Sequence, residues 1–303
     1  MPFQGTIYLN HHRHSRFARP DNAKPLRLTE RDRAIVAAVA SYRCLRSDQL
    51  QALFFPSRRT CNRALARLYH HRFLQRLRPL IEWGSGDCPT IYVLDTKGRD
   101  LLTQAGLLEH VRISESHKPI SRYFLDHTLA LNGVCIALTR AAHTQGITLE
   151  RWISEAEFRH SPDKIEYSGP QNRVLTRAIR PDAACILRQP HYTSRLLLEI
   201  DRATEDNPRF VRDKVRPGVA YLKSRAYKAR FGFNSGRWLV VTTSETRLAN
   251  MKRATEAAVG REASVFYFTT FAQMNAETVL TAPIWYRGNR HRPQSLLHSV
   301  ERV

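Results

Sequence analysis

Acidic residues are scarce in this sequence, which has 27 Asp and Glu against 48 Lys and Arg in 303 residues and a formal net charge of +21. So large a positive excess favours a polyanionic partner such as nucleic acid. Long apolar runs are also missing. The longest, such as residues 34–40, are far shorter than the roughly 20 residues that cross a bilayer. We therefore expect no membrane-spanning segment.

Paired cysteines are absent too, because the five cysteines form no CxxC motif and none has a histidine at zinc-ligand spacing. A structural zinc site is therefore not expected. Residues 1–10 lack the charged start and apolar stretch of a secretion signal, which predicts a cytoplasmic protein with reduced thiols. With 42% hydrophobic and 9% aromatic residues, the chain has enough apolar side chains to fold, and its length predicts two domains.

The first 110 residues predict a basic arm followed by a winged helix-turn-helix domain. Residues 1–27 are basic and aperiodic, which is typical of a flexible arm. Thr29 is a good helix N-cap with Asp32 at the third helical position, and an apolar stripe follows over residues 35–42. Further elements complete the domain over residues 28–110: a short helix from Ser47, a third helix over 58–71, strands over 73–77 and 90–94, and a turn over 83–87 that forms the wing.

The third predicted helix is amphipathic, with Cys61, Leu65 and Leu68 on one face and mainly basic residues on the other. Residues 42–80 hold nine arginines and a single acid, a local balance of +8. Arginine neutralises phosphates and can bond bidentately to guanine, so this surface is a candidate DNA interface. We expect Arg59, Asn62, Arg63 and Arg67 in the major groove, Arg58 and Arg72 at phosphates, and Arg76, Arg78 and the wing at the adjacent backbone.

The second half predicts an α/β domain over residues 122–285, joined to the first by a polar linker over 111–121. Its last two strands are continuous apolar runs that alternate with helices, as in the parallel part of a sheet covered on both faces. A loop over 161–171 and a loosely held basic tail over 286–303 are also expected. The predicted helices span 123–143, 209–225 and 246–259, and the predicted strands span 148–153, 183–187, 195–200, 238–243 and 265–269.

Three acids make up the candidate catalytic group: Asp182 begins one predicted hairpin strand, and Glu199 and Asp201 end the next. Oxygen ligands of this kind suit Mg²⁺, so Asp182 and Glu199 are candidate metal ligands. The segment resembles the core of the PD-(D/E)XK nucleases, a restriction-endonuclease-like fold, except that Asp201 stands where that pattern has lysine. Without a cation to orient water and balance the phosphate, cleavage is not favoured. Lys214 or Lys223 on the following helix are the alternatives that could supply it.

Several short segments follow one another in the order found in a known family: residues 28–32, 58–71, 92–98, 126–132 and 198–202. Over residues 28–285 the chain resembles the replication-relaxation family. The resemblance implies an N-terminal winged helix joined to a nuclease-like α/β domain that has lost cleavage. It also implies an association with plasmids and other mobile elements, where members assist replication or DNA mobilisation.

Together these observations predict a sequence-selective, double-stranded DNA-binding protein of a mobile element, acting as a replication or mobilisation accessory factor or a transcriptional regulator, without a cofactor. The alternative is a metal-dependent endonuclease or nickase, with Mg²⁺ held by Asp182 and Glu199. A further alternative for the acids is structural pairing with Arg180 and Arg202. An RNA-associated protein would explain the charge equally well, but no RNA-binding module pattern is present. A homodimer, or a complex with other replication or mobilisation proteins, stays open.

Overall fold

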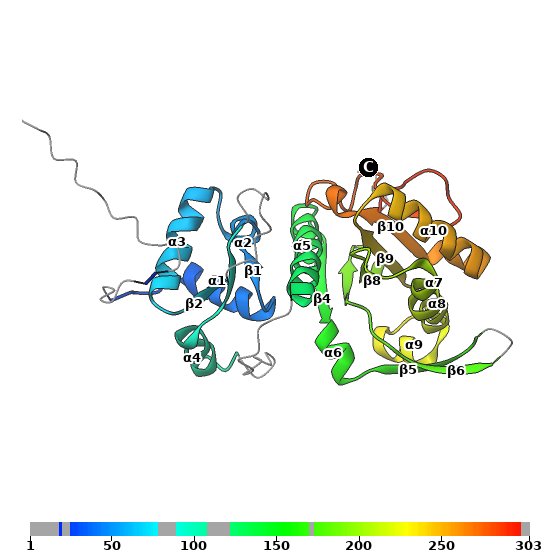
Figure 1. Ribbon diagram of the computed structural model, residues 1–303, viewed down its shortest axis with the longest axis horizontal. Helices are drawn as coiled ribbons and strands as arrows, with labels where there is room; N and C mark the ends of the chain where they lie inside the picture. The colour runs from blue at the N-terminus through cyan, green and yellow to red at the C-terminus, as the bar shows by residue number, and fades with distance from the viewer. Residues whose placement is uncertain (1–17, 20–24, 78–88, 108–121, 170–172, 298–303) are drawn as a thin grey trace, which may run out of the picture. The chain divides into compact units, whose positions relative to one another are not determined.

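The computed structural model describes residues 18–19, 25–77, 89–107, 122–169 and 173–297. The chain divides into two compact units, residues 1–120 and 121–303 (Figure 1). Among the helices in the described ranges, none is both long enough and apolar enough to cross a bilayer.

The first unit combines helices with a three-stranded antiparallel sheet of order β1-β3-β2. Thr29 and Asp32 form the predicted capping box, in which each side chain accepts the other's backbone N–H. The apolar stripe is buried as predicted, although Tyr42 at its end is only half-buried. The described elements are α1 (Glu30–Ser41), β1 (Leu45–Arg46), α2 (Ser47–Phe54), α3 (Arg58–His70), β2 (Leu74–Leu77), β3 (Ile91–Leu94) and α4 (Thr96–Gln104).

The second unit is built on a six-stranded mixed sheet of order β11-β10-β9-β8-β7-β4. Strands β8, β9 and β10 run parallel, and the other neighbours pair antiparallel. The predicted α/β class, with a helical N-terminal region and a mixed sheet flanked by helices, is confirmed. The strands of this sheet are β4 (Thr148–Ser154), β7 (Ala183–Arg188), β8 (Thr193–Ile200), β9 (Arg237–Thr242), β10 (Phe266–Thr270) and β11 (Tyr286–Arg287).

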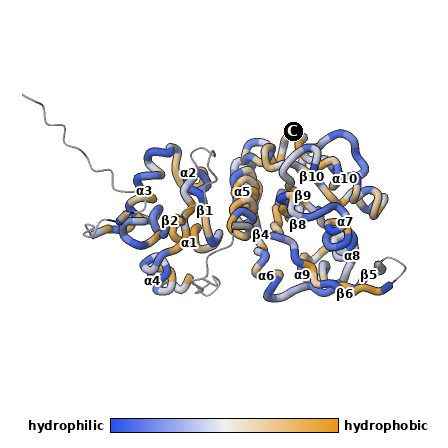
Figure 2. Tube along the Cα trace, viewed as in Figure 1, coloured by the Kyte–Doolittle hydropathy of each residue, from blue (hydrophilic) through white to orange (hydrophobic). Residues whose placement is uncertain are grey.

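Helices cover both faces of this sheet, with α5 on one side and α7, α8 and α10 on the other (Figure 1). Helix α5 carries both apolar and polar residues (Figure 2), and its apolar residues Leu129, Val134 and Leu138 are buried. The remaining described elements are α5 (Arg122–Thr144), α6 (Glu155–His160), the hairpin strands β5 (Asp163–Ser168) and β6 (Val174–Ile179), α7 (Asn207–Phe210), the π-helical turn η2 (Val211–Val215), α8 (Arg216–Lys223), α9 (Arg225–Phe231), α10 (Glu245–Val259) and the 3₁₀ turns η3 (Gly260–Val265) and η4 (Phe271–Gln273).

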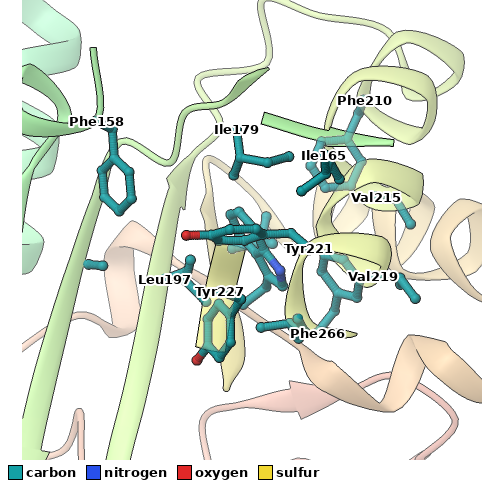
Figure 3. Close-up of a cluster of buried hydrophobic side chains, with 14 of the residues drawn as sticks. Phe158, Ile165, Ile179, Leu197, Phe210, Val215, Val219, Tyr221, Tyr227 and Phe266 are labelled. Atoms are coloured by element: carbon teal, nitrogen blue, oxygen red, sulfur yellow. The ribbon is translucent and has the colours of Figure 1, made fainter. Parts of the chain in front are cut away.

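An aromatic core holds α8 and α9 against the sheet (Figure 3). The rings of Tyr221 and Tyr227 meet edge to face, with centroids 5.1 Å apart. Phe210 and Val215 belong to the same core and bound the π-helical turn η2 at both ends. Because both anchors are buried, the position of Lys214 next to Val215 is fixed by apolar packing.

The helical stretch expected near 209–225 is confirmed, since α7, η2 and α8 follow one another without a gap over residues 207–223, and the extended Ser224 separates them from α9. Two other sequence predictions for the second unit are wrong in detail. The loop expected over 161–171 contains strand β5 of a hairpin. The segment expected as a loose tail packs on the unit as far as residue 297, because its basic residues are interspersed with apolar side chains, and Leu296 and Leu297 are buried. The expected linker and wing lie outside the described residues.

Candidate functional site

Helix α3 presents one buried and one exposed face. Ser57 caps its N-terminus by accepting a backbone N–H of the first turn, so the helix begins at Arg58. Cys61, Leu65 and Leu68 are buried, which confirms the predicted phase of the helix. The residues predicted to face DNA therefore lie on the other side.

The exposed start of α3 carries Arg58, Arg59, Asn62 and Arg63. In the described part of the chain, neither Arg59 nor Arg63 forms an ion pair with a carboxylate. Arg72 is also exposed, and its positive φ of 62° turns the chain from α3 towards β2. Within the described residues, Arg59 and Arg63 are thus two guanidinium groups that no acid neutralises, at the spacing of neighbouring helical turns.

Arg67, in contrast, contacts an acid. Its Nη2 lies 2.9 Å from both carboxylate oxygens of Asp32, which is buried at the start of α1. The side chain predicted to enter the major groove therefore joins α3 to α1.

Arg76 is likewise packed on aromatic rings. Its guanidinium carbon lies 4.3 Å from the centre of the Tyr69 ring and 5.7 Å from that of Tyr92. Cation–π contacts of this length are attractive, and they hold this β2 side chain against α3, which carries Tyr69, and β3, which carries Tyr92. Arg78 and the predicted wing over residues 83–87 lie outside the described residues.

Arg19, inside the predicted flexible arm, is anchored to the first unit. Its guanidinium lies 4.4 Å from the centre of the Tyr69 ring and donates to the Tyr69 carbonyl oxygen. It also pairs with Asp95, the N-cap residue of α4. The arm is thus tied to the domain at this residue.

A second group of functional residues forms in the second unit, where β7 and β8 pair. The register sets Ala183 opposite Leu198, and the backbone N–H of Asp182 donates to the Leu198 carbonyl oxygen at 3.0 Å. Asp182 in turn accepts the N–H of Ile200 at 2.7 Å. This pairing brings the Asp182 side chain to the end of β8 that carries Glu199, as the sequence predicts.

Lys214 completes this group. Its Nζ lies 2.7 Å from Glu199 Oε1 and 2.9 Å from Oε2. The lysine comes from the π-helical turn η2, a type of turn that often occurs at functional sites. Of the two lysines considered from the sequence, Lys214 reaches the acids, whereas Lys223 pairs with Glu262.

His127, on α5, also belongs to the group formed by Asp182, Glu199 and Lys214, and the sequence did not predict this. Its Nε2 lies 3.3 Å from Asp182 Oδ1. Residues 126–132 belong to the segments that resemble the family, but no local pattern marks this histidine as functional. We call His127, Asp182, Glu199 and Lys214 the acidic cluster.

Burial and neighbouring charges shift the pKa values within the acidic cluster. Burial raises the pKa of Glu199 to about 8, against the opposing effect of the Lys214 ammonium. Burial also acts to raise the pKa of Asp182, but hydrogen bonds and charge from His127 and Lys214 outweigh it and hold that pKa low. The two carboxylates raise the pKa of Lys214 although burial opposes this, so the lysine is a cation at neutral pH.

Asp201 does not join the acidic cluster. Its carboxylate accepts bonds from Arg247 Nε and Nη2, both at 3.0 Å, and from the Thr242 hydroxyl. The Asp201 carboxylate therefore connects the end of β8 to β9 and α10. Its geometry gives no support for the predicted catalytic role of Asp201.

Mg²⁺ would find two carboxylates in the acidic cluster, Asp182 and Glu199. Within the described ranges, no three or more His, Cys, Asp and Glu side chains are arranged to hold a metal ion. Because Mg²⁺ keeps several waters and needs only one or two carboxylates, the pair suits its donor chemistry. A bound ion would compete with Lys214 for Glu199.

Comparison with known proteins gives one family. A family model described as Replication-relaxation matches residues 36–235, more than half of the chain. No curated protein and no solved structure matches it. The matched range includes α3 and all members of the acidic cluster.

Proposed function

The chain belongs to the replication-relaxation family, and on that premise we propose that it is a sequence-selective, double-stranded DNA-binding protein. In this proposal it assists the replication or mobilisation of a plasmid or another mobile element, or regulates transcription there. The first unit, taken as a winged helix, makes the principal DNA contact.

The exposed basic start of α3 is the observation that carries this proposal. Arg59 and Arg63 project from a helix whose other face is buried, and neither is paired with an acid in the described residues. Unpaired guanidinium groups on an accessible helix can bind phosphates and bond bidentately to guanine in the major groove. The net charge of +21 adds a long-range attraction to any polyanion.

Roles for the predicted interface residues follow from their surroundings. Arg59, Asn62 and Arg63 read base edges, while Arg58 and Arg72 contact phosphates. Arg67 and Arg76 leave this set, because the first is bound by Asp32 and the second packs on two aromatic rings. Through these contacts, Arg67 and Arg76 position α3, the helix that carries the three base-reading residues.

Selection from a random library of duplex DNA tests the proposal. The full chain is expected to enrich one motif, and a duplex carrying that motif should shift at lower protein concentration than a scrambled duplex. Enrichment of no motif, with equal shifts for all duplexes, would contradict sequence-selective binding.

Phosphodiester cleavage is a second candidate function, and the contact between Lys214 and Glu199 favours it. The sequence predicts a domain without cleavage because position 201 is not lysine. Lys214 supplies an ammonium group beside Glu199, so that reason no longer applies.

In this second function, Asp182 and Glu199 would hold Mg²⁺, which supplies a Lewis acid for the attacked phosphate. Lys214 would orient the attacking water and balance charge on the phosphate. His127 holds Asp182 in place through the contact to Oδ1.

Incubation of the full chain with supercoiled plasmid and Mg²⁺ or Mn²⁺ tests this function. Nicking by the wild type, lost in Lys214→Ala and kept in the control Lys223→Ala, is the expected result for an active cluster. If the plasmid shows a band shift but is not nicked, the result contradicts cleavage and supports DNA binding alone.

A further inference from the structure

A pocket of about 420 Å³ lies at the amino ends of β9 and β10, away from the residues discussed above. It is lined by residues 236 and 237, by residues 264, 265 and 267, and by residues 287, 290, 294 and 296 of the C-terminal segment. Three arginines, Arg237, Arg287 and Arg290, are among the lining residues, and no residue that lines the pocket is acidic. The volume falls in the range of small-ligand sites, which is roughly 300–1,000 Å³.

Two of these arginines are held in place. Arg237 Nη1 donates to the Leu296 carbonyl oxygen at 2.6 Å, and Arg287 Nε donates to the Ser264 carbonyl oxygen at 2.8 Å. Both guanidinium carbons lie near the buried Tyr267 ring, at 5.5 and 5.8 Å from its centre. Arginines fixed in this way lose little freedom when they bind a ligand.

Among the residues that the structure describes, no carboxylate neutralises the positive charge of the pocket, because none of the three arginines forms an ion pair with one. The acids on flanking elements have other partners, since Glu256 binds Lys252 and Glu262 binds Lys223. Three like charges around one cavity repel one another, and an anion between them removes that repulsion.

This pocket is separate from the acidic cluster. In the parallel pairing of β8 with β9, Arg237 is opposite Leu196, whereas Glu199 is opposite Val240. Three residues of strand separate the two positions, which is about 10 Å along the sheet. The pocket therefore opens at the amino end of β9, and the cluster lies towards the carboxyl end of β8.

We propose that the pocket binds the phosphate groups of a ligand of nucleotide size, which is either a free nucleotide or the phosphorylated end of a nucleic acid strand. Guanidinium groups match phosphate oxygens in charge and in bidentate geometry. A carboxylate ligand would leave part of the charge of three arginines uncompensated, whereas a phosphate chain carries several negative charges. This site goes beyond the DNA contact proposed for the first unit.

Titration calorimetry on the full chain tests the proposal, with ATP and with a short single strand that carries or lacks a 5′-phosphate as probes. Arg290→Gln is the principal variant, because the Arg290 side chain is exposed and the contacts that hold Arg237 and Arg287 do not involve it. Arg253→Gln, at an exposed position of α10 outside the pocket, is the matched control.

Binding about tenfold weaker in Arg290→Gln and unchanged in Arg253→Gln is the expected result. Binding of ATP identifies a free nucleotide as the source of the phosphate, and binding that requires the 5′-phosphate identifies a strand end. If Arg290→Gln does not fold, Arg290→Lys, which keeps the charge but not the guanidinium group, replaces it in the same measurement. Dissociation constants above about 10 mM for every probe, or equal binding by wild type and the Arg290 variants, would overturn the proposal.

Discussion

Arg67 Nη2 lies 2.9 Å from both carboxylate oxygens of Asp32, the residue that also accepts the backbone N–H of Thr29 at the start of α1. The Asp32 side chain is only 2% exposed. A buried carboxylate needs a compensating partner, and Arg67 is its cation. This contact thus ties α3 to α1.

Replacing Arg67 is therefore expected to cost stability. Arg67→Gln should lower the free energy of unfolding by about 1–3 kcal/mol, because Asp32 loses its charged partner while it stays buried. The exposed Arg63→Gln should stay within about 0.5 kcal/mol of wild type. Urea unfolding compares the two variants, and equal losses would show that the Asp32 contact does not stabilise the fold.

Leu65 on the opposite face of α3 should affect stability alone. Its side chain is fully buried, so Leu65→Ala should lower the free energy of unfolding by about 2–5 kcal/mol through lost burial and a residual cavity. Thermal unfolding measures the loss. At a temperature where the variant is folded, its affinity for DNA should equal that of wild type, and a changed affinity would place Leu65 in the interface.

DNA binding by the full chain should weaken steeply with salt. About six phosphate contacts give a slope near −5 in a plot of log affinity against log salt concentration, since each contact releases counterions. Arg72→Gln should reduce the magnitude of that slope by about 1. Fluorescence anisotropy over a salt series gives both slopes. Equal slopes for the two proteins would remove Arg72 from the phosphate contacts.

Asp201→Lys would restore the nuclease sequence pattern, but it should destabilise the protein. The new ammonium would face Arg247, which now binds the buried Asp201 carboxylate, and loss of such a pair costs about 3–5 kcal/mol. Calorimetric melting measures this effect. A stable Asp201→Lys protein that gains metal-dependent nicking would contradict the assignment of Lys214 as the cation of the cluster.

Local patterns account for what the sequence predicts correctly. The capping box of Thr29 and Asp32 spans a few residues, and the phase of α3 follows from apolar residues one helical turn apart. The meeting of Asp182 with Glu199 also follows from local pairing, because both lie on one hairpin.

The parts that could not be predicted depend on contacts between distant segments. Asp32 and Arg67 are 35 residues apart, and Asp201 and Arg247 are 46 apart. His127 reaches Asp182 from a helix that precedes the sheet, and nothing local to either residue indicates the contact. Lys214 could be named as an alternative, but the π-helical turn that directs it to Glu199 has no clear sequence signal.

The most direct test of DNA readout by α3 is a competition measurement of affinity for the selected duplex and for a scrambled one. The proteins compared are wild type, the double variant Arg59→Gln/Arg63→Gln and the control Arg33→Gln, which alters an exposed arginine of α1. The double variant should lose about 1–3 kcal/mol of discrimination per base-reading arginine with unchanged melting, while the control keeps full discrimination. A double variant that discriminates as well as wild type would contradict the account.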